Sequence, residues 1–254
     1  MQILLACAKT MNENTPVRVS GTTTPLFNAA AELFAKELSM MDIEDLADIL
    51  HCNRRIAAEN KLRYMQFMDE GQKLPAILAY YGQAYKCLQA DTFTAPDFDY
   101  AQSHLHITSF LYGLLRPLDR IHPYRLEGKS ILQSAHADSM FSYWQELLTD
   151  VLLKSVAADD GLLLHLATKE MERLFDWKRV KKGLRIIQPQ FLVNTGGKLK
   201  AVSVYAKSCR GAMTRYVIEN RISTPESLEA FSYQGFRYAP EHSSVDTPVF
   251  IMDL

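Results

Sequence analysis

Side chains that can bind an anion are most concentrated between residues 112 and 127, in a segment that Gly113, Pro117 and Pro123 interrupt. Arginine offers a planar fork of donors that matches phosphate or carboxylate, and tyrosine adds a stacking face and a hydroxyl. The segment therefore favours a nucleotide or a nucleic-acid backbone as its ligand. The alternative interpretation is that its arginines pair with its own acids and fix an irregular loop. The side chains in question are Tyr112, Arg116, Asp119, Arg120, Tyr124, Arg125 and Glu127.

Lys207 and Arg210 form a second group. The pattern of the surrounding residues predicts a strand over 198–205 and a helix over 208–221, so the two cations would lie at the start of that helix. Free N–H groups and partial positive charge at a helix N-terminus attract anions. The spacing therefore predicts an anion-binding site at this junction.

Lys9 and Thr10 are a third anion-seeking pair, directly after a short apolar segment at 2–6, although their loop lacks the glycines of a phosphate-binding loop. The four cysteines form no C-x-x-C pair, and His104 and His106 have no acid or thiol at metal-binding spacing. We therefore expect neither a metal nor a cofactor. No nucleophile elbow or catalytic triad pattern occurs, so the residues alone do not establish an enzyme.

The charge of the chain is unevenly distributed. The net charge is -1, but the segment 178–221 carries eleven Lys or Arg residues and a single acid, Glu219. A concentrated basic segment in a near-neutral protein attracts a phosphate backbone locally, whereas an evenly mixed surface does not. The alternative is a solvated basic face that acidic helices beside it balance.

The elements that must position these groups follow from hydrophobic spacing, capping residues and turn residues. Their order is neither a steady alternation of strands and helices nor a segregation of the two. We therefore predict an α+β (mixed α/β) fold, with residues 1–254 as a single domain that has a mixed β-sheet surrounded by helices. Strands are expected at 2–6, 76–81, 107–111, 162–167, 184–192, 198–205, 236–238 and 249–252, and helices at 26–38, 43–51, 54–67, 94–104, 139–156, 208–221 and 225–231.

The absence of long apolar stretches and the scattered cysteines predict a cytoplasmic protein with no membrane contact. The hydrophobic fraction of 48% and the charged fraction of 22% are typical of a folded globular chain. We expect a monomer.

Several segments, in order along essentially the whole chain, resemble the YaaA family. The two most specific are L-Y-G-L-L-R-P-L-D at 111–119 and Y-A-K-S-C-R-G-A-M-T-R-Y-V-I-E-N-R at 205–221. Ala6-Cys7 and His165-Leu166-Ala167-Thr168 depart from the family, which often has Ser-Pro and Asn-Leu-Ala-Ser there. The remaining matches are Ala8-Lys9-Thr10, Tyr80-Tyr81-Gly82 with Tyr85, Asp97-Phe98-Asp99 and Pro123-Tyr124-Arg125-Leu126-Glu127.

The resemblance implies a cytosolic bacterial protein that limits free iron, and hence hydroxyl-radical damage, during hydrogen peroxide stress. It also implies a fold peculiar to the family, with a positively charged cleft and a helix-hairpin-helix-like element that binds double-stranded DNA. Gly113 is the one glycine in the expected place of that hairpin. The resemblance assigns to the cleft, and not to catalysis, Lys9, Thr10, Tyr112, Arg116, Asp119, Tyr124, Arg125, Glu127, Lys207, Arg210, Arg215, Asn220 and Arg221.

Two functions stay open at this point. The first is a protective protein that binds DNA phosphates without turnover. The second is an enzyme that acts on a nucleotide-like or other small anionic molecule in the same cleft, with Asp119 or Glu127 moving protons. Direct sequestration of iron ranks last, because the sequence lacks a carboxylate and histidine cluster at ligand spacing.

Overall fold

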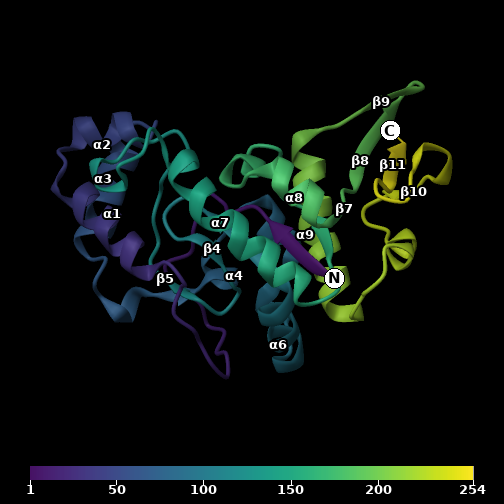
Figure 1. Ribbon diagram of the computed structural model, residues 1–254, viewed down its shortest axis with the longest axis horizontal. Helices are drawn as coiled ribbons and strands as arrows, with labels where there is room; N and C mark the ends of the chain where they lie inside the picture. Colours follow the sequence, from purple (N-terminus) through teal and green to yellow (C-terminus); the bar gives the residue numbers. More distant parts are fainter. Residues whose placement is uncertain (254) are drawn as a thin grey trace.

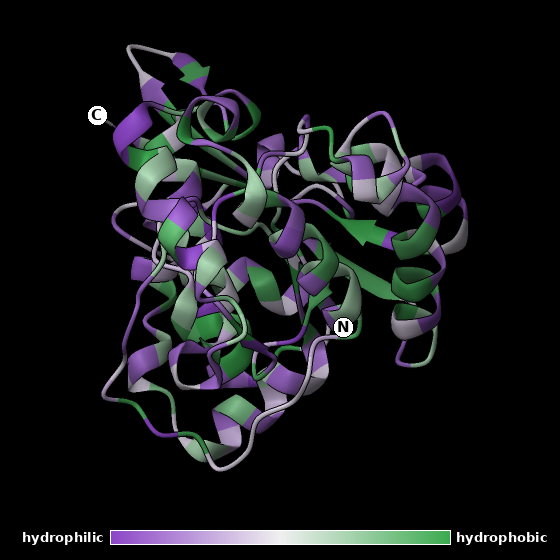
Figure 2. Ribbon diagram, turned by 90° about the vertical axis from the view of Figure 1, so that its left-hand side faces the viewer, coloured by the Kyte–Doolittle hydropathy of each residue, from purple (hydrophilic) through white to green (hydrophobic). Residues whose placement is uncertain are grey.

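The computed structural model describes residues 1–253 and is built around a five-stranded sheet. The inner strands run parallel to one another, and only the edge strand next to Leu105–Ser109 is antiparallel. Parallel strands that are covered on both faces consist mostly of apolar residues. The strands inside this molecule are accordingly coloured green, for hydrophobic residues, in Figure 2. In spatial order the strands are β4 (Gly113–Leu115), β3 (Leu105–Ser109), β1 (Gln2–Leu5), β6 (Leu162–His165) and β7 (Arg185–Ile187).

The chain leaves β1 through a long helical excursion before it returns as β3. The first three helices of this excursion form the left-hand end of the molecule in Figure 1. The helices are α1 (Asn28–Met40), α2 (Ile43–Ile49), α3 (Arg54–Met65), α4 (Ala76–Ala79), α5 (Gln83–Leu88) and α6 (Ala95–His104), with 3-10 turns at Glu70–Gln72 and Ala90–Thr92.

The second half of the chain adds strands on the opposite side of β1. Helix α7 (Met140–Ala157) carries the chain from β4 to β6, and α8 (Trp177–Gly183) carries it from β6 to β7. Because β3 and β6 flank β1, the chain connections diverge there, and the carboxyl ends of the parallel strands meet at one edge. In open α/β sheets this is where ligands bind.

A second, four-stranded sheet follows β7 and occupies the right-hand side of Figure 1. It packs against α9 (Ser203–Asn220), and stacked or edge-on contacts join Phe191, Phe231 and Phe250. Its strands in order are β10 (Arg237–Tyr238), β11 (Val249–Asp253), β8 (Gln190–Thr195) and β9 (Lys198–Lys200), with 3-10 turns at Glu226–Ala230 and Pro240–His242.

The predicted mixed α/β fold with a mixed β-sheet is confirmed, since the five-stranded sheet combines parallel pairs with one antiparallel edge pair. The described chain has the two sheets above and a two-stranded pair of β2 (Leu74–Pro75) with β5 (Arg120–Ile121). The α7 prediction is confirmed with its cap, since the Ser139 side chain accepts a hydrogen bond from the Ser142 N–H. The helix predicted over 94–104 is confirmed as α6, and Thr94 and Asp97 form a capping box at its start. Further 3-10 turns lie at Gln133–Ala135 and Met171–Leu174.

Two strand predictions fail because an apolar run also suits a buried helix. Within the strand predicted over 76–81, residues Ala76–Ala79 instead form the short buried helix α4, whose first N–H groups bond to the carbonyls of Asp119 and Pro117. The strand predicted over 198–205 ends at Lys200, and α9 begins at Ser203, five residues earlier than expected.

Gly113 does not belong to a helix-hairpin-helix element. It opens β4, directly after the turn that joins β4 to the antiparallel β3. Its φ is +76°, and a Cβ there would lie 2.7 Å from the Trp144 ring. A glycine is therefore required by the turn and by the packing of α7. Among residues 1–253, no helix is both long and apolar enough to cross a membrane.

Candidate functional site

A cavity of about 340 Å³ lies at the carboxyl ends of β1 and β6, where the chain connections diverge. Its floor is apolar and aromatic, and its lining residues come from six separate parts of the chain. The volume is that of a small-molecule site. Lining residues include Leu5, Cys7, Lys9, Thr10, Gln83, Tyr85, Phe110, Tyr124, Arg125, Leu126, Glu127, Leu166, Thr168, Glu170, Met171, Lys207 and Arg210.

The loop after β1 carries Lys9 and Thr10 to the cavity, and the segment before α5 holds that loop in place. The Tyr81 N–H donates to the Thr10 carbonyl at 2.9 Å. The Tyr85 hydroxyl donates to the Ala6 carbonyl at 3.0 Å. Lys9 and Thr10 are exposed, so they form part of the rim of the cavity, which is where the anion-seeking pair was expected.

Tyr124, Arg125 and Glu127 form the second wall. The Tyr124 hydroxyl is 2.8 Å from that of Tyr80 and 2.6 Å from Ser109 Oγ. Burial raises the pKa of the Tyr124 phenol well above its usual value, so it stays protonated. The backbone carbonyl of Arg125 accepts a hydrogen bond from the Tyr64 hydroxyl.

Glu127 compensates two of the cations in the cavity. One of its oxygens lies 2.8 Å from Lys9 Nζ and 2.9 Å from an Arg125 Nη. The Glu127 and Arg125 side chains are only 11% and 15% exposed, so this is a largely buried ion pair. The proposed pairing of Arg125 with Glu127 is confirmed, although both side chains also line the cavity.

Lys207 and Arg210 enter from α9 without a compensating acid. Among residues 1–253, neither side chain lies within ion-pair distance of a carboxylate, whereas Lys9 and Arg125 do. Lys207 is exposed and Arg210 is half-buried. Burial lowers the pKa of the Arg210 guanidinium, which stays charged because arginine titrates far above neutral pH. An anionic ligand would supply the negative charge that these two cations lack within the described residues.

The cations on α9 are not at a helix N-terminus, contrary to prediction. The helix begins at Ser203, so Lys207 and Arg210 lie in its second and third turns and project from one face at i, i+3 spacing. Their side chains, and not free backbone N–H groups, are the donors to the cavity. A hydrogen bond of 2.9 Å from the Gln83 amide to Ser208 Oγ ties this face to α5.

Tyr112, Arg116 and Asp119 do not reach the cavity. Tyr112 is fully buried, and its hydroxyl accepts the His122 N–H at 3.0 Å. Asp119 is 1% exposed and accepts hydrogen bonds from Thr23 Oγ1 at 2.6 Å and the Arg116 N–H at 2.8 Å. The Arg116 guanidinium pairs with it at 3.0 Å, as the loop-fixing alternative expected.

Three further predicted residues hold parts of the protein together and do not line the cavity: Arg215, Asn220 and Arg221. Arg215 donates to the Leu88 and Gln89 carbonyls at the end of α5. The Asn220 side chain donates to the Tyr216 carbonyl one turn earlier. Arg221 pairs with Asp97 at 2.8 Å. Six of the thirteen predicted residues are thus outside the cavity.

The substitution Asp119→Asn is expected to lower the free energy of unfolding by about 3 kcal/mol, because it removes a buried charge and leaves an NH₂ group facing donors. Thermal or urea unfolding measures the loss. Asp99→Asn, at an exposed position, is the matched control. A full loss of ligand binding by the folded Asp119→Asn protein would contradict the structural role.

The polar cavity residues that were not predicted as site residues include Cys7, Gln83, Thr168 and Glu170. Cys7 and Thr168 were visible only as departures from the family pattern. Burial raises the pKa of the Cys7 thiol to about 12, so Cys7 lacks the thiolate that a nucleophile needs. Glu170 follows β6 by five residues, and only the order of strands in the sheet could have brought it to the same edge as Lys9.

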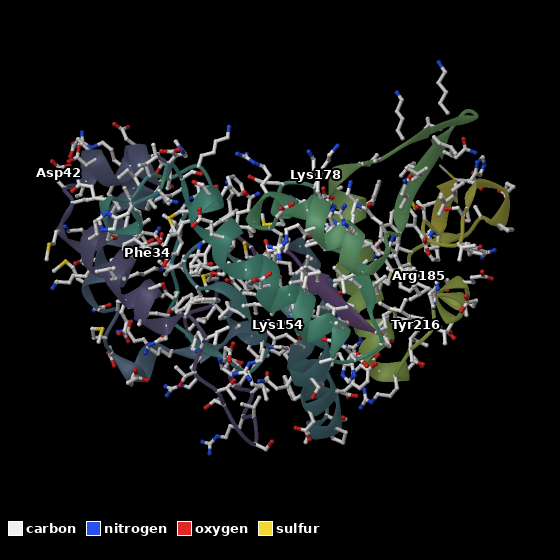
Figure 3. The ribbon with its side chains drawn as sticks, viewed as in Figure 1. Phe34, Asp42, Lys154, Lys178, Arg185 and Tyr216 are labelled. Carbon is white, nitrogen blue, oxygen red and sulfur yellow. The ribbon has the colours of Figure 1, made fainter. Side chains whose placement is uncertain are left out.

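The cations of the basic segment 178–221 are spread over α8, β7, β9 and α9 with its C-cap residue. Arg179, Arg185, Arg215 and Arg221 are paired with acids. Lys178 on α8 and Arg185 on β7 stand well apart in Figure 3, and only Lys207 and Arg210 line the cavity. Among the described residues, no group of three or more His, Cys, Asp or Glu is placed to hold a metal ion.

Comparison with known proteins gives one consistent result. A profile of the family described as "Peroxide stress protein YaaA" matches residues 1–242. A UPF0246 protein of Bacteroides thetaiotaomicron is 45% identical over 252 residues, which cover 99% of this chain and 98% of that protein. UPF0246 proteins of Phocaeicola vulgatus (46% over 245 residues, 96% of each chain) and Porphyromonas gingivalis (41% over 257 residues, 100% of each chain) are also similar.

Proposed function

Because the chain belongs to the YaaA family of peroxide stress proteins, we propose that it protects DNA by binding the phosphates of a duplex at the cavity rim. The observation that carries this proposal is that Lys207 and Arg210 face the cavity without an acidic partner among the described residues. Lys9 and Lys207 are exposed and can reach a backbone that stays outside. The half-buried Arg210 adds a second positive charge from inside the cavity.

Phosphate binding of this kind is largely independent of sequence and weakens as salt rises, because each neutralised phosphate releases counterions. Ferrous ions near DNA are among the cations that a bound protein displaces. Hydrogen peroxide and Fe²⁺ give Fe³⁺, hydroxide and a hydroxyl radical, and that radical reacts close to where it forms. Displacing iron from the backbone therefore lowers damage to the covered DNA without any iron ligand from the protein.

A second candidate is an enzyme that acts on a small anionic molecule in the same cavity. It is favoured by the two carboxylates, Glu127 and Glu170, that line a recess of about 340 Å³. A surface that only binds phosphate gains nothing from a nearly buried acid such as Glu127, whose side chain is 11% exposed. In this candidate Arg125 and Arg210 hold the anion and a carboxylate moves a proton.

The substitution Glu127→Gln separates the two candidates. If the rim binds duplex phosphates, removing this charge releases Lys9 and Arg125, so duplex affinity should rise several-fold and the log-log salt slope should steepen by about one. Fluorescence anisotropy of a labelled duplex measures both quantities.

If Glu127 is instead a catalytic acid or base, Glu127→Gln removes turnover of the small molecule and has no such effect on a duplex. Weaker duplex binding by a folded Glu127→Gln variant would contradict the DNA proposal. Circular dichroism at the assay temperature shows that the variant is folded, which matters because Arg125 loses its buried partner.

A further inference from the structure

Duplex binding at the rim does not account for the inner part of the cavity. A base-paired duplex is too wide to enter a recess of about 340 Å³, so its phosphates stay at the mouth of the cavity. Yet the recess continues inward to a floor that includes Phe110, Leu126 and Leu166, all nearly fully buried. Such a floor binds an apolar, flat group better than it binds a phosphate.

The inner walls also carry polar atoms without a partner. Arg125 Nε and Thr168 Oγ1 are both buried and form no hydrogen bond among the described residues. Buried donors and acceptors are normally satisfied, so two such atoms in one cavity indicate a ligand with hydrogen-bonding edges. With Glu127 and Glu170 as acceptors, the walls offer both donors and acceptors to such an edge.

We propose that the cavity accepts a single nucleotide that is extruded from the duplex. This inference rests on the proposed duplex binding and specifies what enters the site. Lys9 and Lys207 at the rim contact the flanking phosphates, the base lies on the apolar floor, and Arg125 and Thr168 bind its edge. Extrusion costs least for a mismatched or unpaired base, so the protein should prefer such sites over fully paired DNA.

The test is the fluorescence of a duplex with one central 2-aminopurine, either paired with thymine or mismatched with cytosine. Stacking quenches 2-aminopurine, so extrusion raises its emission. Saturating protein should raise the emission of the mismatched duplex several-fold and bind it several-fold more tightly than the paired one. Anisotropy of an end label on the same duplexes reports binding separately.

Two variants at Thr168 locate the base. Thr168→Trp fills the cavity without breaking a protein hydrogen bond, because the Thr168 hydroxyl makes none within residues 1–253. It should abolish the emission rise and lower the affinity for the mismatched duplex to that for the paired duplex, whose binding depends on the rim and should stay. Thr168→Val, of the same shape, should keep most of the rise.

Competition with a free nucleoside monophosphate tests the same cavity in the unaltered protein and does not depend on how Thr168→Trp folds. The nucleotide should reverse the emission rise at concentrations that leave the end-labelled duplex bound. Duplex binding with no emission rise overturns the extrusion inference and leaves duplex binding intact. Absence of duplex binding at low salt overturns both.

Discussion

Replacing Gly211 with alanine is expected to lower the free energy of unfolding by about 3 kcal/mol or more, a large effect for one methyl group. Gly211 lies in α9 where α5 packs against it. A Cβ at this position would lie 1.8 Å from the Ala84 carbonyl oxygen. That oxygen belongs to the backbone of a buried contact, so the two helices must separate to make room.

Chemical unfolding with circular dichroism measures this loss. Gly21→Ala is the matched control, because a Cβ at Gly21 meets no atom within 4 Å, and its effect should stay within about 1 kcal/mol. Since Ala84 and Gln83 line the cavity, Gly211→Ala should also weaken ligand binding by protein that remains folded. Unfolding curves that coincide for Gly211→Ala and the unaltered protein would contradict the close packing of α5 and α9.

Local elements were largely predictable from the sequence, because their signals lie within a few residues. The helix over 139–156 was predictable because its apolar residues recur at helical spacing. The hairpin between β8 and β9 follows from Thr195, Gly196 and Gly197, where both glycines have positive φ. The start of α9 was missed because Val202, Val204 and Tyr205 favour a strand locally, while packing against α5 favours a helix.

The cavity itself was not predictable from the same signals. Lys9, Glu127, Glu170 and Arg210 are far apart in the sequence and meet only because β3 and β6 flank β1. Local composition also cannot distinguish an arginine that faces a ligand from one that fixes the chain. Arg116 and Arg210 look alike in the sequence, but only Arg116 has an acid, Asp119, within reach.

The double substitution Lys207→Ala with Arg210→Ala should weaken duplex binding at least about tenfold at moderate salt, since hydrogen bonds to charged groups contribute about 1.5–3 kcal/mol each. These two cations have no acidic partner among the described residues, so their charge is free to act on a phosphate. Their loss should flatten the log-log salt slope by about 1.8, which is two phosphate contacts at about 0.9 each.

The fold should tolerate this change, because no hydrogen bond joins either side chain to another described residue. A matched control is Lys36→Ala with Arg55→Ala, which removes the same charge from exposed positions on α1 and α3 at the left-hand end of the molecule, away from α9 (Figure 1). That variant should bind the duplex as the unaltered protein does.

The most direct test of phosphate binding at the cavity rim is anisotropy of a labelled duplex at several salt concentrations with these three proteins. The unaltered protein should bind at low salt with a negative, linear log-log slope. The Lys207 and Arg210 variant should show a slope about 1.8 shallower, and the control an unchanged one. Absence of binding at low salt, or parallel slopes for all three proteins, would contradict duplex binding at this site.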